Sequence, residues 1–242
     1  SNGDLYEAND IGKTSLQAYL LNAQKAVTIL DLLYGPQGTT PVSDEEYTDF
    51  INNSCYYIES VQIPLIDYST YTMADDTQKE QIQQVAEQCL QQLQVEADGQ
   101  TVSSSALYEA ASTYVPQAME LLGATMEDAS QAVYYAGSQL YTPDDLASYG
   151  SDEYNNLTDP LDEAGMNEWT TIDLGTTILV ARRVDPFKTY TVAQLTSMYD
   201  LLTALKGDDL QNQFYADGAA LNHALDEGAM KTYSASKIKK NV

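Results

Sequence analysis

The amino-terminal part of the chain carries the clearest periodicity. From Thr14 to Tyr34, apolar residues recur at spacings of three and four, which predicts an amphipathic helix that needs a partner surface. Gly35 and Pro36 then end this helix. Similar periodicity predicts further helices over residues 44–53, 77–94, 103–122, 125–136, 143–149, 191–206 and 210–221.

Two other stretches alternate apolar and polar residues as strands do. The first covers 61–65, where Pro64 favours an edge position or a bulge. The second is a hairpin over 168–184, whose closing part has apolar residues on both faces and therefore resembles a central strand. The stretch 138–162 is rich in Tyr, Asp, Asn and Ser, and we expect it to be mainly surface loop.

The order of these elements predicts an α+β, helix-rich chain. Helices come first, a small unit with two separated strands follows, and helices return at the end. The two outer helical segments both carry apolar stripes, so the most economical packing buries them against each other. An all-α bundle without a sheet is the alternative reading.

The charge of the chain restricts its possible functions more than it restricts its fold. The 242 residues contain 11 Lys and Arg against 36 Asp and Glu, a formal charge of −25. This balance argues against nucleic-acid partners and anionic lipid surfaces, since both need a basic footprint. The segment 181–242 is close to neutral. Its basic tail either docks on the acidic body or simply belongs to a highly charged, soluble surface.

Little in the sequence indicates cofactor or metal chemistry. Cys55 and Cys89 form no CxxC motif, so we expect two buried free thiols, with a single disulfide as the alternative. His223 is the only histidine and lies in an ordinary amphipathic context, which disfavours a Ser/His/Asp triad. We expect no metal and no cofactor. Neither a transmembrane run nor a signal peptide is present, and Ser1-Asn2 suggests that a natural signal or membrane anchor has been removed.

Three stretches together resemble the PrsA/SurA-type extracytoplasmic foldases of bacteria. PVSDEEYTDF at 41–50 is similar to a helix of that family, and VQIPLI at 61–66 follows it at the distance of the first strand of a parvulin-type prolyl isomerase domain. GTTILV at 175–180 resembles the closing parvulin strand. The segment from 184 to 238 resembles the C-terminal helical part of related clostridial surface proteins.

The resemblance implies a division of the chain and a function. It implies an N-terminal helical segment at 1–55, a parvulin-like domain with a small antiparallel or mixed sheet at 56–187, and a C-terminal helical segment at 188–242 that packs on the N-terminal helices. It further implies a secreted protein or cell-surface lipoprotein that acts as a chaperone or foldase on unfolded, secreted or proline-containing polypeptides. A non-catalytic cell-surface scaffold is the alternative.

The resemblance also exposes a departure at the active site. Parvulins use two facing histidines on the first and last strands, whereas this chain has Gln62 and Thr177 in the corresponding places. The chain also lacks the glycine-rich stretch of active parvulins. We therefore expect weak or absent peptidyl-prolyl cis-trans isomerase activity, and the sequence leaves the existence of any catalysis open.

Aromatic residues are the remaining candidates for binding. The chain has 19 tyrosines, and tyrosine offers large contact area at low entropic cost, which suits polypeptide surfaces. The alternative is that most of them lie half-buried at strand and helix edges, and that the single tryptophan belongs to the core. The candidate polypeptide-binding residues are Tyr68, Tyr71, Tyr134, Tyr135 and Trp169.

Overall fold

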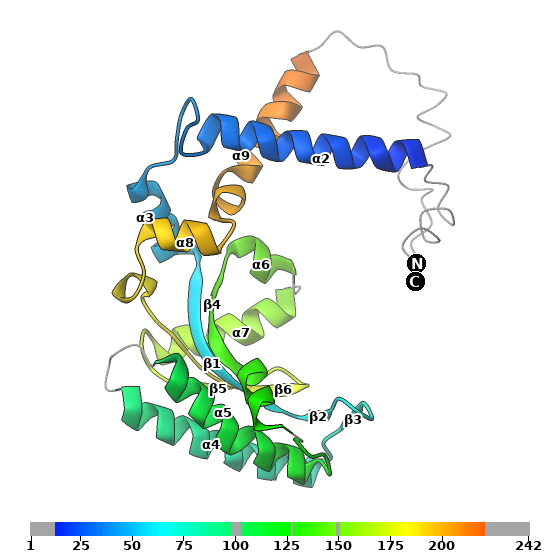
Figure 1. Ribbon diagram of the computed structural model, residues 1–242, viewed down its shortest axis with the longest axis vertical. Helices are drawn as coiled ribbons and strands as arrows, with labels where there is room; N and C mark the ends of the chain where they lie inside the picture. The colour runs from blue at the N-terminus through cyan, green and yellow to red at the C-terminus, as the bar shows by residue number, and fades with distance from the viewer. Residues whose placement is uncertain (1–12, 98–102, 127, 149–150, 221–242) are drawn as a thin grey trace. The chain divides into compact units, whose positions relative to one another are not determined.

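The computed structural model describes residues 13–97, 103–126, 128–148 and 151–220 (Figure 1). The chain forms two compact units. The larger unit is 44–201, and the smaller unit contains the described residues 13–43 and 202–220. The fold is α+β and helix-rich, as the order of sequence elements predicts.

The larger unit is built on a four-stranded antiparallel sheet. Its strands are β1 (Tyr56–Pro64), β4 (Ala136–Tyr141), β5 (Thr170–Asp173) and β6 (Thr177–Arg183), in the spatial order β4-β1-β6-β5. The predicted hairpin forms β5 and β6, and the first strand pairs with the last although more than a hundred residues separate them. A second, two-stranded sheet consists of β2 (Ile66–Asp67) and β3 (Thr72–Met73).

Two long helices cover one face of the four-stranded sheet. They are α4 (Asp76–Ala97) and α5 (Ser104–Leu121), and Figure 1 shows them side by side against the sheet. Val61 and Val180 oppose each other on the central strands and are completely buried with the apolar residues of both helices. Pro116 lies inside α5 without splitting it. This layer is the main hydrophobic core of the larger unit.

Two shorter helices cover part of the opposite face. They are α6 (Pro143–Ser148) and α7 (Ser151–Ala164), and their buried leucines pack on Leu179 and Ala181 of β6. A third cluster lies at the end of the sheet, where α3 (Asp44–Ser54) packs with α8 (Val192–Met198). The unit that contains the sheet therefore includes one helix from each flanking segment.

The smaller unit contains the two terminal helices that the structure describes. They are α2 (Lys13–Tyr34) and α9 (Leu201–Ala220), and they are in contact, which confirms that the N- and C-terminal helices pack together. Within this contact, Nζ of Lys206 lies 5.7 Å from the ring centre of Tyr34. Each unit thus combines early and late parts of the sequence.

Three local predictions are wrong. Residues 138–162 are not mainly loop, because they contain most of β4 and α7. β4 buries only Leu140 and so lacks the alternation of a strand, and Pro160 lies inside α7 although proline usually ends a helix. The helix predicted over 191–206 breaks at 199–200, and Gly207 lies within α9 rather than at a helix end. The stretch 125–136 forms a 3₁₀ helix, η1 (Ala129–Tyr135), and then enters β4.

Candidate functional site

Gln62 and Thr177 lie on the two central strands, but they do not face each other. The register places Gln62 opposite Leu179 and Thr177 opposite Pro64. Because partners in an antiparallel pair share a face, Gln62 and Thr177 lie on the same face, one diagonal step apart. Their strands are neighbours, as expected. Their side chains, however, are not opposite each other.

Neither of these two side chains provides a group that titrates near neutral pH. The hydroxyl Oγ1 of Thr177 donates a hydrogen bond of 2.9 Å to the carbonyl oxygen of Ile63, so it holds the two strands together. Gln62 is exposed to solvent although it belongs to a central strand. The helices α6 and α7 therefore leave the side chain of Gln62 uncovered, although its cross-strand partner Leu179 packs against their leucines.

The exposure of Gln62 has a simple topological cause. β4 pairs with β1 only from Tyr56 to Val61, so β1 continues past the end of β4. Pro64, which lacks a backbone N–H, is the last residue of β1 and lies in this extension. The sequence predicts an edge position at Pro64. This prediction is confirmed at the end of β1, although the rest of β1 is a central strand.

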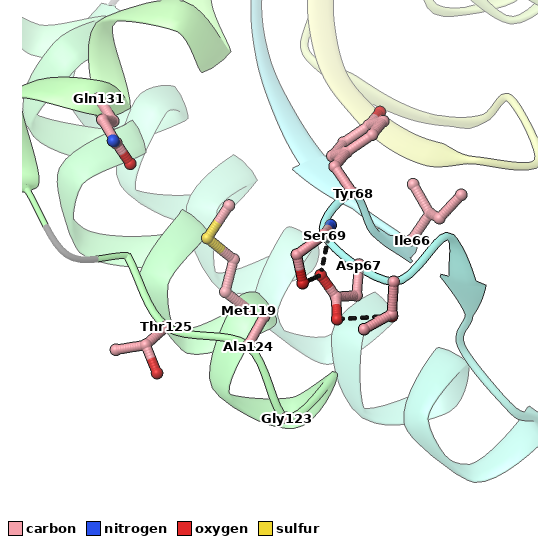
Figure 2. A pocket seen from close by; sticks show the side chains of 10 residues that line it. Ile66, Asp67, Tyr68, Ser69, Met119, Gly123, Ala124, Thr125 and Gln131 are labelled. Atoms are coloured by element: carbon pink, nitrogen blue, oxygen red, sulfur yellow. Dashed lines mark hydrogen bonds between the residues drawn. The ribbon is translucent and has the colours of Figure 1, made fainter.

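A pocket of about 540 Å³ lies near this end of the sheet. One wall is the β2–β3 hairpin, and the other is formed by the end of α5, the loop after it and Gln131 of η1. Figure 2 shows Tyr68 of the hairpin on one side, with Met119 and Gln131 on the other. The lining residues are Ile66, Asp67, Tyr68, Ser69, Thr70, Met119, Gly123, Ala124, Thr125 and Gln131.

Asp67 holds the hairpin turn in shape. Its Oδ1 accepts hydrogen bonds from the backbone N–H of Ser69 at 2.8 Å and from the Ser69 hydroxyl at 2.7 Å, and its Oδ2 accepts one from Thr70 at 2.7 Å. These hydrogen bonds, the Ser69 hydroxyl first, lower the pKa of Asp67. Tyr71 completes the turn with a φ of 56°, in the left-handed region.

Four of the five aromatic candidates lie in these segments. Tyr68 and Tyr71 on the hairpin are 53% and 78% exposed, and Tyr134 on η1 is 81% exposed. Tyr135 is half-buried, and burial, followed by the proximity of Tyr68, raises its pKa. The charge of Tyr68 thus acts on Tyr135, and the hairpin and η1 both contribute residues to the pocket wall.

Trp169 does not belong to this surface. It is only 6% exposed and lies in the main core, and the guanidinium carbon of Arg182 stands 5.0 Å from its ring centre. Arg182 in turn pairs with Glu59. The structure thus favours the core alternative for Trp169, and we leave this residue out of the proposed binding surface.

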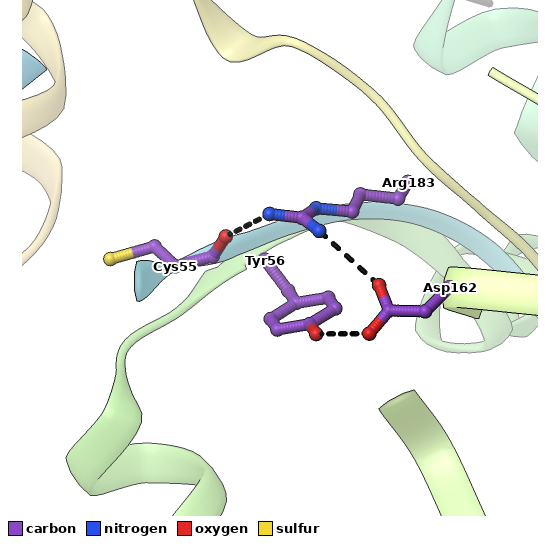
Figure 3. A network of polar contacts seen from close by, with 4 residues as sticks. All are labelled: Cys55, Tyr56, Asp162 and Arg183. Carbon is purple, nitrogen blue, oxygen red and sulfur yellow. Dashed lines mark hydrogen bonds and ion pairs between the residues drawn. The ribbon is translucent and has the colours of Figure 1, made fainter. Parts of the chain in front are cut away.

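A second polar network joins α7 to the sheet. Figure 3 shows Arg183 between the carbonyl oxygen of Cys55, at 3.0 Å, and Oδ1 of Asp162, at 3.3 Å. The hydroxyl of Tyr56 donates to Oδ2 of Asp162 at 2.8 Å, and the guanidinium of Arg183 lies 4.1 Å from the ring centre of Tyr56. These contacts tie Asp162 of α7 to Tyr56 of β1 and Arg183 of β6, which indicates a role in attaching the helix.

The two cysteines are free and buried, as the sequence favours. They belong to separate apolar clusters, Cys55 at the end of the sheet and Cys89 in the main core. Burial, and next the negative charge of Asp145, raises the pKa of the Cys55 thiol to about 12. A thiol in this environment stays protonated at neutral pH and is a poor nucleophile.

Other chemistry finds no support in the part of the chain that the structure describes. Within those residues, no group of three or more His, Cys, Asp or Glu side chains could hold a metal ion. No helix searched there is long and apolar enough to cross a membrane. His223 lies outside the described residues.

Comparison with known proteins does not place this chain in a family. No family model, no curated protein and no solved structure matches it. The candidate site is therefore assigned from the geometry of the structure alone. Sequence reasoning singled out Tyr68, but it missed the pocket residues Asp67, Met119 and Gln131. Nothing in the sequence indicates that the turn at 67–71 meets the end of α5.

Proposed function

We propose that this chain is an extracytoplasmic foldase homologue that binds unfolded or proline-containing polypeptide and has weak or no prolyl isomerase activity. The observation that carries the proposal is the position of Tyr68, which lies at a pocket wide enough for a large side chain. Tyr71 and Tyr134 add exposed aromatic surface in the neighbouring segments. Secretion or attachment to the cell surface belongs to the same proposal and is supported by the family resemblance alone.

The arrangement of the sheet supports the kinship on which this proposal depends. A parvulin-like domain requires the stretch at 61–66 and the stretch at 175–180 to be neighbours. Val61 pairs with Val180, and Ile63 pairs with Ile178, so these stretches do lie side by side.

The expectation of weak catalysis follows from what isomerisation requires. The X–Pro bond crosses a barrier of about 20 kcal/mol, and an enzyme lowers it by binding the twisted amide more tightly than the planar one. Gln62 is exposed to water, and the hydroxyl of Thr177 already bonds to Ile63. These two positions therefore offer no enclosed polar pair that could favour a twisted amide.

Two measurements test the proposal. In a proline-isomerisation assay, we expect catalytic efficiency far below that of an active parvulin, and comparable efficiency would refute the non-catalytic half. In an aggregation assay with a denatured client, we expect suppression at near-stoichiometric amounts. Tyr68→Ala should weaken suppression, whereas Tyr215→Ala, which removes an exposed tyrosine of α9, should not.

A cell-surface scaffold without chaperone activity is the second candidate. The observation that favours it lies in the smaller unit, where α2 exposes several large apolar side chains, among them Leu20, Val27 and Leu32. Exposed apolar residues on one helix suit a stable protein partner. If the aggregation assay shows no suppression by the intact chain, the scaffold function is favoured over the chaperone function.

A further inference from the structure

The segments around the pocket are almost free of basic residues. Lys79 is the only Lys, Arg or His between Lys25 and Arg182, whereas acidic residues occur throughout this stretch. Both walls of the pocket come from this stretch, since they are formed by residues 66–70 and 119–131. Any ligand of the pocket therefore enters a region in which negative charge dominates.

The basic side chains near this stretch are already paired with acids of the same unit. Nζ of Lys79 lies 2.6 Å from Asp173. Arg182 is paired with Glu59, and Arg183 is paired with Asp162. Each of these acids offsets the base that it contacts. The remaining acids of the larger unit therefore set the sign of the local field.

One acidic side chain lines the pocket, and two more acids lie close to lining residues in the sequence. Asp67 is part of the wall, and the hydrogen bonds from the hairpin turn hold it in the charged form. Glu120 is exposed and follows the wall residue Met119, and Asp128 is the exposed N-cap of η1, three residues before Gln131. Asp67 and Tyr68 thus belong to the same wall, Glu120 and Asp128 adjoin the other wall in the sequence, and an aromatic face attracts a cation.

We propose that the pocket recognises cationic polypeptide: an apolar or aromatic side chain enters between Tyr68 and Met119, and Lys or Arg residues on either side of it meet the surrounding acids and tyrosine rings. This inference rests on the proposed function and names its substrate class. Attraction by the field raises the rate of encounter, and the pocket then selects an apolar side chain. Acidic polypeptides are excluded by the same charges.

The experiment compares three labelled peptides by fluorescence anisotropy with the full chain. All three contain the same central Phe-Pro, flanked by four lysines, four serines or four glutamates. We expect the lysine peptide to bind about tenfold or more tightly than the serine peptide at low salt, and the glutamate peptide not to bind. At 0.3 M salt the advantage of the lysine peptide should shrink strongly, because exposed charges are then screened over less than about 8 Å.

Two pairs of variants separate pocket recognition from general attraction to an acidic protein. Glu120→Gln should weaken the lysine peptide about twofold to fivefold and leave the serine peptide unchanged. Glu109→Gln is its matched control, because it removes an exposed acid from the same helix about 16 Å away along the axis. Tyr68→Ala should weaken both peptides, and Tyr215→Ala should weaken neither.

The outcomes are distinguishable. Equal binding of the lysine and serine peptides would overturn the cationic preference and leave the proposed polypeptide binding intact. Unchanged binding of the lysine peptide to Tyr68→Ala would overturn the assignment to this pocket. Failure of all three peptides to bind would overturn the cationic inference and the proposed function together.

Discussion

Arg182 and Glu59 form a buried ion pair between the two central strands. Nε and Nη2 of Arg182 lie 2.9 and 2.8 Å from Oε2 of Glu59, and both side chains are almost completely inaccessible to water. The two residues are directly opposite each other in the β1–β6 register. The pairing of these distant strands thus brings an acid and a base together in the middle of the sheet, with Trp169 against the guanidinium.

We predict that breaking this pair strongly destabilises the fold. Glu59→Gln leaves a buried guanidinium without its counter-charge, and we expect the free energy of unfolding to fall by about 3–5 kcal/mol. Urea unfolding followed by circular dichroism measures this change. Asp162→Asn is the matched control: it removes the partner of the adjacent Arg183 in a more exposed pair and should cost about 1 kcal/mol or less.

A double variant tests the cause. Replacing both members, as Glu59→Leu with Arg182→Met, removes the buried charges together, and much of the lost stability should return. If Glu59→Gln costs no more than Asp162→Asn, the buried pair does not hold the two central strands together as described.

The pocket tyrosine is predicted to dominate polypeptide binding. Tyr68→Ala removes the aromatic wall, and we expect a loss of affinity of at least about 1–2 kcal/mol, which is roughly tenfold. Titration of a labelled unfolded client measures the affinity. Tyr68→Phe keeps the ring and should retain most of the binding. Equal affinities for the wild type and Tyr68→Ala would place the binding surface elsewhere.

The buried thiol of Cys55 predicts how stability changes at alkaline pH. Its pKa is raised from 9.0 to about 12, so the unfolded chain loses this proton at a lower pH than the folded chain does. The contribution of the thiol to stability is therefore complete below about pH 9 and is lost as the pH rises towards 12. The loss approaches about 1.4 kcal/mol per pH unit for one group.

Cys55→Val removes this titration and keeps an apolar side chain of similar size. We expect urea unfolding between pH 9 and pH 10.5 to show a smaller fall in stability for the variant than for the wild type. Both proteins contain the same tyrosines, so the contribution of these residues cancels in the comparison. Parallel curves would mean that the Cys55 thiol ionises as easily in the folded state as in the unfolded one.

We expect the hairpin turn to become less stable at acidic pH, because Asp67 stabilises it in the charged form. Its pKa is lowered by hydrogen bonds, so its stabilising effect is present above its ordinary value of 3.8 and is lost as the pH falls through the lower, folded value. Asp67→Asn should speed hydrogen exchange at the Ser69 amide, because the turn loses its carboxylate acceptor. Asp76→Asn removes a nearby exposed charge and should leave this exchange rate unchanged. An unchanged rate in Asp67→Asn would show that the turn does not depend on the carboxylate.

Two long helices could be predicted from their regular apolar period, whereas β4, which lacks an alternating pattern, could not. The helix expected from Thr14 to Tyr34 and the helix expected over 77–94 both form, because an apolar stripe is a local property of the sequence. β4 forms because β1 offers a free edge beside it, although its own residues contain only one buried apolar side chain, Leu140. Its cause lies in a strand about eighty residues away.

The candidate site also contains residues that the sequence could predict and residues that it could not. Tyr68 and Tyr71 could be selected as binding residues because exposed tyrosines near turns are typical of contact surfaces. The place of Met119 and Gln131 beside Tyr68 depends on how the end of α5 meets the hairpin, which no local pattern contains. Trp169 was a binding candidate with the core as its alternative, and its burial in the main core favours that alternative.

The sequence by itself determined the acidic character, the α+β class, the positions of α2, α4 and α5 and the absence of histidines at positions 62 and 177, because these follow from composition and short-range periodicity. Only the tertiary structure decided that Gln62 and Thr177 are offset rather than opposed, that Glu59 meets Arg182, and that a pocket lies beside Tyr68. The first two features depend on the register between strands more than a hundred residues apart, which is set by the burial of both sheet faces at once. The pocket depends on how the end of α5 meets the β2–β3 hairpin.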